Sequence, residues 1–359
     1  MKPLFIISSS CISPQNSFGG IEGLNAVHYP HEPAYYCQEP DFSKYINPVQ
    51  IRRMSRALKM GYTAAIDALD KSGFITVDAV IIGTGKGCLS DTEIFLHSIE
   101  TYQETALNAT HFIHSTYNQL NGLIALNKKI SCYNITYVHR GFSLEHALLD
   151  AALYFAEHPN SLVLAGSFDE MTPDHYKVKK QWGYWKDSPL HGQSLLYSKT
   201  PGTIAGEGSA FFVLSSEKPN EPAVKICDIQ TLYAPESDEV MTCLNNFLER
   251  NQLQKEDIDL LMLGENGDIN HAVNYPIIAE QLPESEKIYF KHLCGEYDTA
   301  INFGLWAGYE ILLKQYIPEC MRLEVSARSK PFQYLLIYNN YFGKNQGFIL
   351  LKLENQDSA

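Results

Sequence analysis

The chain has 359 residues, of which 45% are hydrophobic, which is enough for one large duplicated fold or for two domains. Its formal net charge of −13 argues against nucleic acid as a ligand, because phosphate binding requires a basic surface. No apolar run reaches the roughly 20 residues that a membrane helix needs. The eight cysteines are scattered without a CxxC pair, which argues against a zinc site or a disulfide framework and favours reduced thiols in a cytoplasmic protein.

The first half of the chain alternates apolar strands with amphipathic helices. Residues 4–14 (LFIISSSCISP) form a short apolar run broken by serines, which predicts a buried strand rather than a signal peptide. Further predicted elements follow in this order: a helix around Met54–Leu69, a strand ending in glycine within Thr76–Gly87, a strand, sharp turn and helix within Lys128–Phe155, and strands at Ser161–Phe168 and Gly206–Leu214. The GTGKG segment lacks the full P-loop spacing and is typical of a turn, so we expect no nucleotide, other cofactor or metal.

The second half repeats these landmarks in the same order. It begins after the clearest break, the polar segment Ser215–Val224 with its two prolines. The repeated landmarks are a helix around Val240–Arg250, a strand ending in glycine within Asp257–Asp268, and strands at Phe332–Gly343 and Asn345–Leu353. Continuous apolar strands that alternate with helices predict a sheet buried on both faces. We therefore expect two similar α/β halves, residues 1–216 and 223–359, joined by a linker at 215–222.

Several segments, taken in order, resemble the β-ketoacyl synthase family of the thiolase-like fold. They are the opening strand, the long helix in Arg52–Leu69, the strand and turn Val80–Gly87, the Gly-rich strand and Glu-Met-Thr-Pro of Leu164–Pro173, and the Gly-Glu-Gly turn within Gly202–Leu214. The resemblance spans nearly the whole chain, which is shorter than typical members. It implies a duplicated five-layer α-β-α-β-α architecture.

The resemblance also implies a chemistry, the decarboxylating Claisen condensation that elongates acyl chains. In the family, a Cys on a strand-to-helix turn takes an acyl group from an acyl carrier protein. Two His residues, supported by a Lys, then stabilise the charge that develops as malonyl loses CO₂. Here the turn falls on Asn134–Gly141 (NITYVHRG), which places Tyr137 at the Cys position. A phenol, with a reference pKa near 10, cannot replace a thiolate in thioester exchange. The nearest thiol, Cys132, is interpreted as a small buried residue inside the strand.

The first family His belongs to a segment that follows the strand of the second half. The matching segment is LGENGDIN, which places Leu263 at the His position. A shift of two or three residues would place Glu265 or Asn266 there instead. No shift of that size brings in a His, and His271 is interpreted as a polar residue at the start of a helix.

The second family His belongs to a Lys-Ser-x-x-Gly-His pattern. The segment FKHLCGEYDTAIN fits this pattern with Lys291 retained and Glu296 at the His position. A carboxylate there would repel a malonyl carboxylate and an enolate. His292 replaces the family Ser, and we expect its side chain to point elsewhere. Lys344 replaces the Phe of the C-terminal gating loop.

The three altered positions, together with retained turns such as Gly206–Gly208, resemble a chain-length factor, a catalytically silent subunit that pairs with an active synthase. The implied partners are an active ketosynthase in a heterodimer, or a second copy of this chain, and an acyl carrier protein. The segment Tyr133–Ala151 is similar to sequences from bacterial polyene-pigment and dialkylresorcinol clusters, which suggests that product class.

The resemblance places the dimer interface beside the strand-to-helix turn, with Thr116–Leu126 close to it. Bulky side chains there are candidates for setting the depth of an acyl tunnel, because aromatic rings fill much volume. These candidates are Phe112, Tyr133 and Phe142, and ordinary core packing is the alternative for each. Tyr133, Tyr137 and His139 would equally form a hydrogen-bonded cluster at the interface.

Two other functions remain open from the sequence. One is an active synthase or acyltransferase with a rearranged site, which would use Cys132 as nucleophile, or His139, Glu265 or Glu296 as base. The other is a module that binds acyl groups or carrier proteins without any role in condensation. Acyl transfer to this chain alone, lost in Cys132→Ala, would favour the first.

Overall fold

The computed structural model describes residues 1–29, 34–188, 190, 192–219, 222–324 and 330–354. Within these residues, ten strands form one sheet. From edge to edge the strands are β4 (Tyr133–Tyr137), β3 (Ala79–Gly83), β5 (Leu162–Asp169), β7 (Gly208–Ser215), β1 (Leu4–Ile12), β8 (Ala223–Tyr233), β12 (Asn345–Glu354), β11 (Tyr334–Tyr341), β9 (Leu260–Leu263) and β10 (Glu286–Tyr289). A separate parallel pair is formed by β2 (Ala34–Tyr35) and β6 (Ala205–Gly206).

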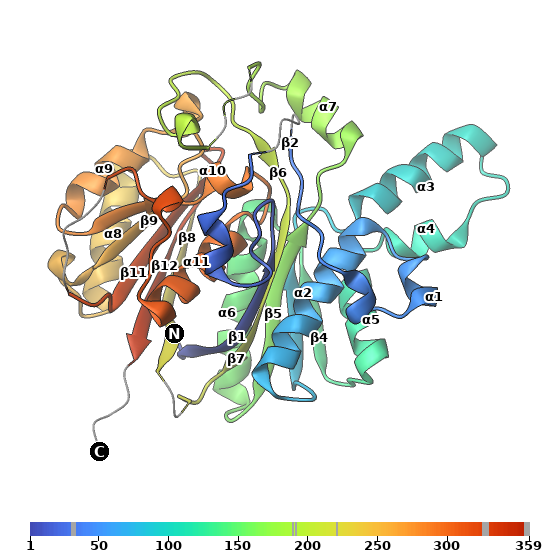
Figure 1. The fold of residues 1–359 in the computed structure, drawn as a ribbon, viewed down its shortest axis with the longest axis horizontal. Coiled ribbons are helices and arrows are strands. Elements are labelled where there is room, and N and C mark those ends of the chain that lie inside the picture. Colours follow the sequence, from blue (N-terminus) through green and yellow to red (C-terminus); the bar gives the residue numbers. More distant parts are fainter. Residues whose placement is uncertain (30–33, 189, 191, 220–221, 325–329, 355–359) are drawn as a thin grey trace.

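Helices cover both faces of this sheet (Figure 1). The α-helices are α1 (Pro48–Ile51), α2 (Arg56–Ser72), α3 (Leu89–Tyr102), α4 (Ala109–His114), α5 (Gln119–Lys128), α6 (Ser143–Glu157), α7 (Pro173–Gln181), α8 (Ser237–Arg250), α9 (Asn274–Gln281), α10 (Lys291–Cys294) and α11 (Ile301–Lys314). Short 3-10 turns are η1 (Ile21–Asn25), η2 (Phe42–Lys44), η3 (Arg140–Phe142), η4 (Gly192–Leu195), η5 (Lys255–Asp257), η6 (Ile269–His271) and η7 (Glu319–Met321). Among the described residues, no helix is long and apolar enough to cross a membrane.

The sheet contains the same arrangement twice. In the first half β4, β3 and β5 are parallel to one another; β7 then pairs antiparallel with β5, and β1 pairs antiparallel with β7. In the second half β10, β9 and β11 are parallel, and β12 and β8 follow antiparallel. The halves meet where β1 pairs with β8. The sheet is therefore continuous, and the division into units at 1–216 and 223–359 stays a prediction. The linker predicted at 215–222 lies between β7 and β8, and its positions 220 and 221 lie outside the described residues.

Alternating side chains along each strand fill three apolar layers. On the outer face of the first half, Val80 and Phe211 pack with helices α2 and α5. On the outer face of the second half, Leu261 and Phe348 pack with α8 and α9. The inward side chains of both halves pack against α6 and α11 in the middle. Burial on both faces explains the continuous apolar strands and gives the five-layer thiolase-like architecture expected from the sequence.

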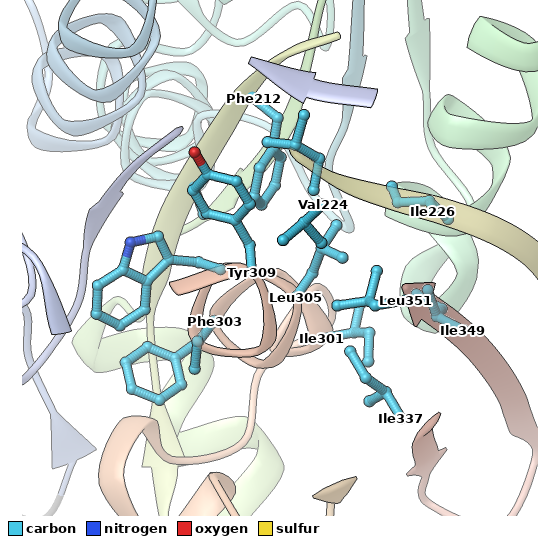
Figure 2. Close-up of a cluster of buried hydrophobic side chains, with 14 of the residues drawn as sticks. Phe212, Val224, Ile226, Ile301, Phe303, Leu305, Tyr309, Ile337, Ile349 and Leu351 are labelled. Carbon is cyan, nitrogen blue, oxygen red and sulfur yellow. The ribbon is translucent and has the colours of Figure 1, made fainter. Parts of the chain in front are cut away.

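Helix α11 is the centre of the middle layer. Figure 2 shows Ile301, Phe303, Leu305 and Tyr309 of this helix among side chains from strands of both halves. Nearly all residues of α11 from Ile301 to Leu312 are buried, as expected for a helix enclosed on every side. Because α6 and α11 both begin at the edge where the parallel strands end, the middle layer positions the loops of the candidate site.

The predicted helices and strands are confirmed, with small shifts of their ends. The helix expected around Met54–Leu69 is α2, which ends where Gly73 adopts a left-handed conformation with φ of 76°. The strand, turn and helix of Lys128–Phe155 are β4, η3 and α6. Helices α3 and α4 form an arm that projects beside β4 and α5 in Figure 1, and the sequence reasoning did not anticipate it.

Candidate functional site

A cavity of about 570 Å³ lies where the loops after the parallel strands of both halves meet. Six segments contribute to its lining: Lys86 after β3, Arg140 after β4, Lys179 on α7, Asp268 after β9, Asp298 after β10, and Tyr341 at the end of β11. The carboxyl ends of parallel strands are the usual place for ligands in open α/β sheets. The cavity is therefore the candidate functional site.

The turn after β4 presents Arg140 to this cavity. Arg140 has a φ of 48°, a left-handed conformation that costs a non-glycine residue about 1–2 kcal/mol. Gly141 follows because a Cβ there would lie 2.9 Å from ring atoms of Tyr341. The Ser143 hydroxyl fixes the turn by accepting the His139 N–H at 2.8 Å and donating to the Thr84 carbonyl at 2.8 Å. A cationic guanidinium thus stands where the strand-to-helix turn meets the cavity.

Tyr137 lies three residues before Arg140, the residue of this turn that lines the cavity. It ends β4, is half-buried, and its ring contacts His146 of α6 with centroids 6.1 Å apart. It does not line the cavity. The alignment of Tyr137 with the family nucleophile therefore stays a prediction, and the structure adds Arg140 as the residue at the turn.

A buried polar group lies next to the cavity, formed by Lys291, Glu296 and Asn266. Glu296 Oε2 accepts from Lys291 Nζ at 2.7 Å and from Asn266 Nδ2 at 2.6 Å. Lys291 also donates to the Asn340 carbonyl at 3.1 Å, whereas Glu296 Oε1 has no partner among the described residues. Burial raises the pKa of Glu296, and Lys291 opposes that rise. The structure thus places Lys291 and Glu296, two site residues named from the sequence, in direct contact.

Leu263 lies outside this group. It ends β9 and packs in the outer core of the second half. With Glu265 it lines a different cavity, where burial raises the pKa of Glu265 to about 7. Asn266, one of the two alternatives to Leu263, is the residue that contacts Glu296. His271 belongs to the 3-10 turn η6, and buried His292 is hydrogen-bonded through Nε2 to the Cys320 carbonyl at 2.8 Å, away from the cavity, as expected.

Cys132 is not positioned to serve the cavity. The expectation that it is buried inside the strand is wrong, because it precedes β4 and is only partly buried. The five residues of β4 separate it from the turn, a distance of about 16 Å at roughly 3.3 Å per residue. Burial and the nearby Asp78 carboxylate raise the pKa of the Cys132 thiol, which disfavours the thiolate. The described residues that line the cavity include no Cys or Ser.

Two lysines, Lys86 and Lys179, contact an acidic and a phenolic side chain in the cavity. Lys86 Nζ pairs with Asp298 Oδ2 at 2.6 Å, and the Tyr341 hydroxyl donates to Asp298 Oδ1 at 2.8 Å. Lys179 Nζ donates to the Tyr341 oxygen at 3.0 Å. Burial lowers the pKa of Lys179 to about 8. Burial, with Lys86 and Lys179, lowers the pKa of His175 to about 4, so this histidine is neutral at pH 7.

The motifs that carried the resemblance hold the loops of the site together. Asp169, at the end of β5, accepts from the Gly85 N–H at 2.8 Å and from the Thr299 hydroxyl at 2.7 Å, which ties the loop after β3 to the loop after β10. Glu207 accepts from the Cys37 N–H at 2.7 Å and the Met171 N–H at 3.1 Å. These carboxylates maintain the scaffold around the cavity rather than line it.

Four of the five candidates for the tunnel or interface have exposed side chains, and only Phe142 is buried. Phe112 is exposed on α4, and Lys344 is exposed at the cavity. Tyr133 is exposed on β4 and donates to Asp150 Oδ2 at 3.1 Å. His139 is exposed and stacks on buried Phe142, with ring centroids 5.7 Å apart. Their roles in a tunnel or interface stay predictions.

Sequence reasoning missed Lys86, Arg140, Lys179, Asp298 and Tyr341 as residues of one cavity. The signal available was the position of Lys86 and Arg140 directly after apolar strands. The remaining three come from separate segments, and no local pattern links them. Among the described residues, no group of three or more His, Cys, Asp and Glu side chains is arranged to hold a metal ion.

Comparison with known proteins agrees with this geometry. Residues 29–201 match the family described as beta-ketoacyl synthase, N-terminal domain. A beta-ketoacyl synthase from Burkholderia phymatum superposes with a TM-score of 0.82 at 15% identity, over 99% of this chain and 100% of that one. The ishigamide ketosynthase/chain length factor gives a TM-score of 0.80 at 15% identity, over 99% and 100% of the two chains.

A third structure is a ketosynthase (ApeO) in complex with its chain length factor (ApeC) from Xenorhabdus doucetiae. It gives a TM-score of 0.76 at 13% identity, with 98% of each chain covered. No curated relative matches the chain in sequence. Residues 29–201 thus match the model of the N-terminal domain of β-ketoacyl synthases, and the chain as a whole has the thiolase-like fold seen in the ketosynthase and chain length factor structures.

Proposed function

We propose that this chain is a catalytically silent subunit of the chain-length-factor type, which pairs with an active ketosynthase and binds no acyl group covalently. The observation that carries the proposal is the cavity itself. Condensation requires a thiolate at the turn and hydrogen-bond donors aimed at a developing enolate oxygen. The turn instead presents Arg140, and the neighbouring buried group centres on the Glu296 carboxylate, an acceptor. Neither can perform the required step.

The similar structures support the pairing. One of them is described as a ketosynthase in complex with its chain length factor, and another as a type II acyl-carrier protein in complex with its ketosynthase. We extend both kinds of partner, an active ketosynthase and an acyl carrier protein, to this chain. A homodimer is the alternative for the chain without its partner. The resemblance of Tyr133–Ala151 to polyene-pigment and dialkylresorcinol sequences supports that product class.

The edge of the first half-sheet is the surface we assign to the ketosynthase. Strand β4 is the outermost strand there, and it is paired only with β3 among the described residues. Unpaired edge strands and contiguous exposed apolar side chains both favour association. Exposed apolar residues continue from β4 over neighbouring elements: Ile94, Leu96 and Tyr102 on α3, Phe112 and Ile113 on α4, Leu126 on α5, and Tyr133 on β4.

The active-enzyme alternative requires a nucleophile, and its candidate Cys132 lies at the far end of β4 from the cavity.

A cytoplasmic location is part of the same proposal. The eight cysteines are free, and thiols stay reduced in the cytosol.

Acyl transfer to the purified chain tests its catalytic silence. The chain is incubated with a radiolabelled acyl carrier protein, and an active ketosynthase of the same family serves as the positive control. We expect no protein-bound label on this chain. Label that survives denaturation and disappears in Cys132→Ala would contradict the proposal and favour the active enzyme.

A further inference from the structure

We propose that the cavity binds an organic anion, a carboxylate or phosphate monoester with an apolar body, through Arg140, Lys344 and Lys179. This site goes beyond the proposed function, because a silent subunit needs no ligand at this position.

The charge balance of the cavity is the first support. The chain carries a formal net charge of −13, yet four cationic side chains line the cavity against two carboxylates, Asp268 and Asp298. Despite its burial, Asp298 is held in the charged form by Lys179 and Lys86, which keep its pKa below the ordinary range. Asp268 is engaged through Oδ1 by the Gly202 N–H at 2.9 Å. The cavity therefore has a local surplus of positive charge.

Arg140 and Lys344 supply this surplus at the mouth of the cavity. Both side chains are exposed, and neither has an ion pair or hydrogen bond with another described residue. Their main chains are nevertheless fixed. Arg140 is held in the left-handed turn before Gly141, and the Lys344 carbonyl accepts the Ala234 N–H at 2.6 Å. Two unpaired cations on a fixed backbone are suited to contact an anion that enters from solvent.

Lys179 supplies a buried donor further inside. It is 6% exposed, and its ammonium makes one hydrogen bond, to Tyr341, so two of its three N–H groups have no hydrogen-bond acceptor among the described residues. Four aromatic rings lie 5.2–5.5 Å from Nζ, those of Tyr184, Trp185, Tyr341 and Phe342. A buried ammonium with unused donors is costly unless an acceptor reaches it. An anion in the cavity would provide that acceptor.

Apolar walls select a ligand with an organic body rather than a bare ion. Trp182, Tyr184 and Phe342 line the cavity beside the cations. Its volume of about 570 Å³ lies within the roughly 300–1,000 Å³ of small-molecule sites. A ligand whose flat or aliphatic body packs on these rings, and whose charged end contacts Arg140 and Lys344, would contact both the apolar walls and the exposed cations.

Tryptophan fluorescence provides a direct test with the full chain. Of the three tryptophans, Trp182 lines the cavity, Trp185 faces Lys179, and Trp306 is buried in the core around α11. The probes are benzoate and phenyl phosphate, with neutral benzamide and inorganic phosphate for comparison. We expect saturable quenching by at least one organic anion and none by benzamide. Saturation by benzoate alone identifies a carboxylate site, and by phenyl phosphate alone a phosphate site.

The variants assign the binding to named residues. Arg140→Ala with Lys344→Ala should weaken binding by up to about 25-fold, because each exposed cation contributes about fivefold or less and the two contributions multiply. Lys344→Ala alone leaves the turn after β4 unchanged and should weaken binding by a few fold. The control Arg52→Ala with Arg53→Ala removes the same charge from exposed residues outside the cavity.

Three results would overturn the proposal: no saturable signal with either organic anion, equal affinity in the cavity and control variants, or equally tight binding of benzamide. Binding of inorganic phosphate as tightly as phenyl phosphate would remove the claim of an apolar body. None of these measurements involves the partner synthase, so failure of this site leaves the subunit assignment untouched.

Discussion

Replacing Lys291 by methionine tests the buried group that joins Lys291, Glu296 and Asn266. Both members of the ion pair are 0% exposed, and their charged atoms lie 2.7 Å apart. Without Lys291, the Glu296 carboxylate retains the Asn266 amide on Oε2, while Oε1 keeps no partner among the described residues. Removing one member of a buried pair costs about 3–5 kcal/mol. We expect Lys291→Met to lose that much free energy of unfolding at neutral pH.

A double variant separates two contributions to the loss of stability, the unpaired charge of Glu296 and the lost packing of Lys291. Glu296→Leu, added to Lys291→Met, removes the unpaired carboxylate, and well-packed apolar replacements of buried ion pairs are often neutral or stabilising. The double variant should therefore be more stable than Lys291→Met.

The stability of the single variant Lys291→Met should also depend on pH. Loss of Lys291 raises the pKa of Glu296 further, so protonation relieves the penalty, and the deficit shrinks as the pH falls toward the unfolded-state pKa near 4.3.

Urea denaturation at pH 5 and pH 8 measures these differences, with Lys129→Met as the control for removing an exposed lysine. The reasoning is refuted if Lys291→Met unfolds within about 1 kcal/mol of the unsubstituted chain at pH 8. It is equally refuted if the double variant is less stable than the single one, because the stranded carboxylate would then not be the cause.

Four further outcomes follow from individual residues. Gly141→Ala should cost about 1–3 kcal/mol, measured by urea denaturation, because its Cβ would lie 2.9 Å from the Tyr341 ring; an unchanged midpoint would contradict this close approach. Burial raises the pKa of Glu145 to about 8, so its protonated form stabilises the fold at low pH and that contribution is lost as the pH rises toward 8. Glu145→Gln should flatten this part of the stability–pH curve between pH 5 and 8, and an unchanged slope would exclude Glu145 as its source. Tyr133→Asp places a charge on the exposed edge strand and should weaken pairing with the synthase at least tenfold in a pull-down titration, whereas equal pairing would move the interface elsewhere. Cys132→Ala should leave elongation by the mixed complex unchanged, and a loss would reopen the active-enzyme alternative.

The sequence predicted the fold well because its signal is local and repeated. Apolar strands that run into a glycine recur in both halves: Gly83 ends β3, and Gly264 directly follows the equivalent strand β9. The projecting α3–α4 arm was missed because its helices bury almost nothing in the single chain, with Asp91 as the only buried residue among the two. Without a buried stripe, periodicity gives little evidence for how such helices are placed.

The site was predicted less completely, for two physical reasons. Successive side chains at a strand end point to opposite faces, so a small error of alignment moves a residue from the site to the outer core, as Leu263 and Asn266 illustrate. Lys179 and Asp298 meet only because α7 and the loop after β10 converge at one edge of the sheet. Contacts between segments so distant in sequence cannot be inferred from one sequence without an alignment.

Co-expression of this chain with an active ketosynthase encoded in the same genome, followed by size-exclusion chromatography and an elongation assay, tests the central claim most directly. The proposed function predicts a stable mixed dimer that elongates malonyl units only when both chains are present, with products of defined length. A chain that stays apart from the synthase, and condenses malonyl units by itself, would contradict it.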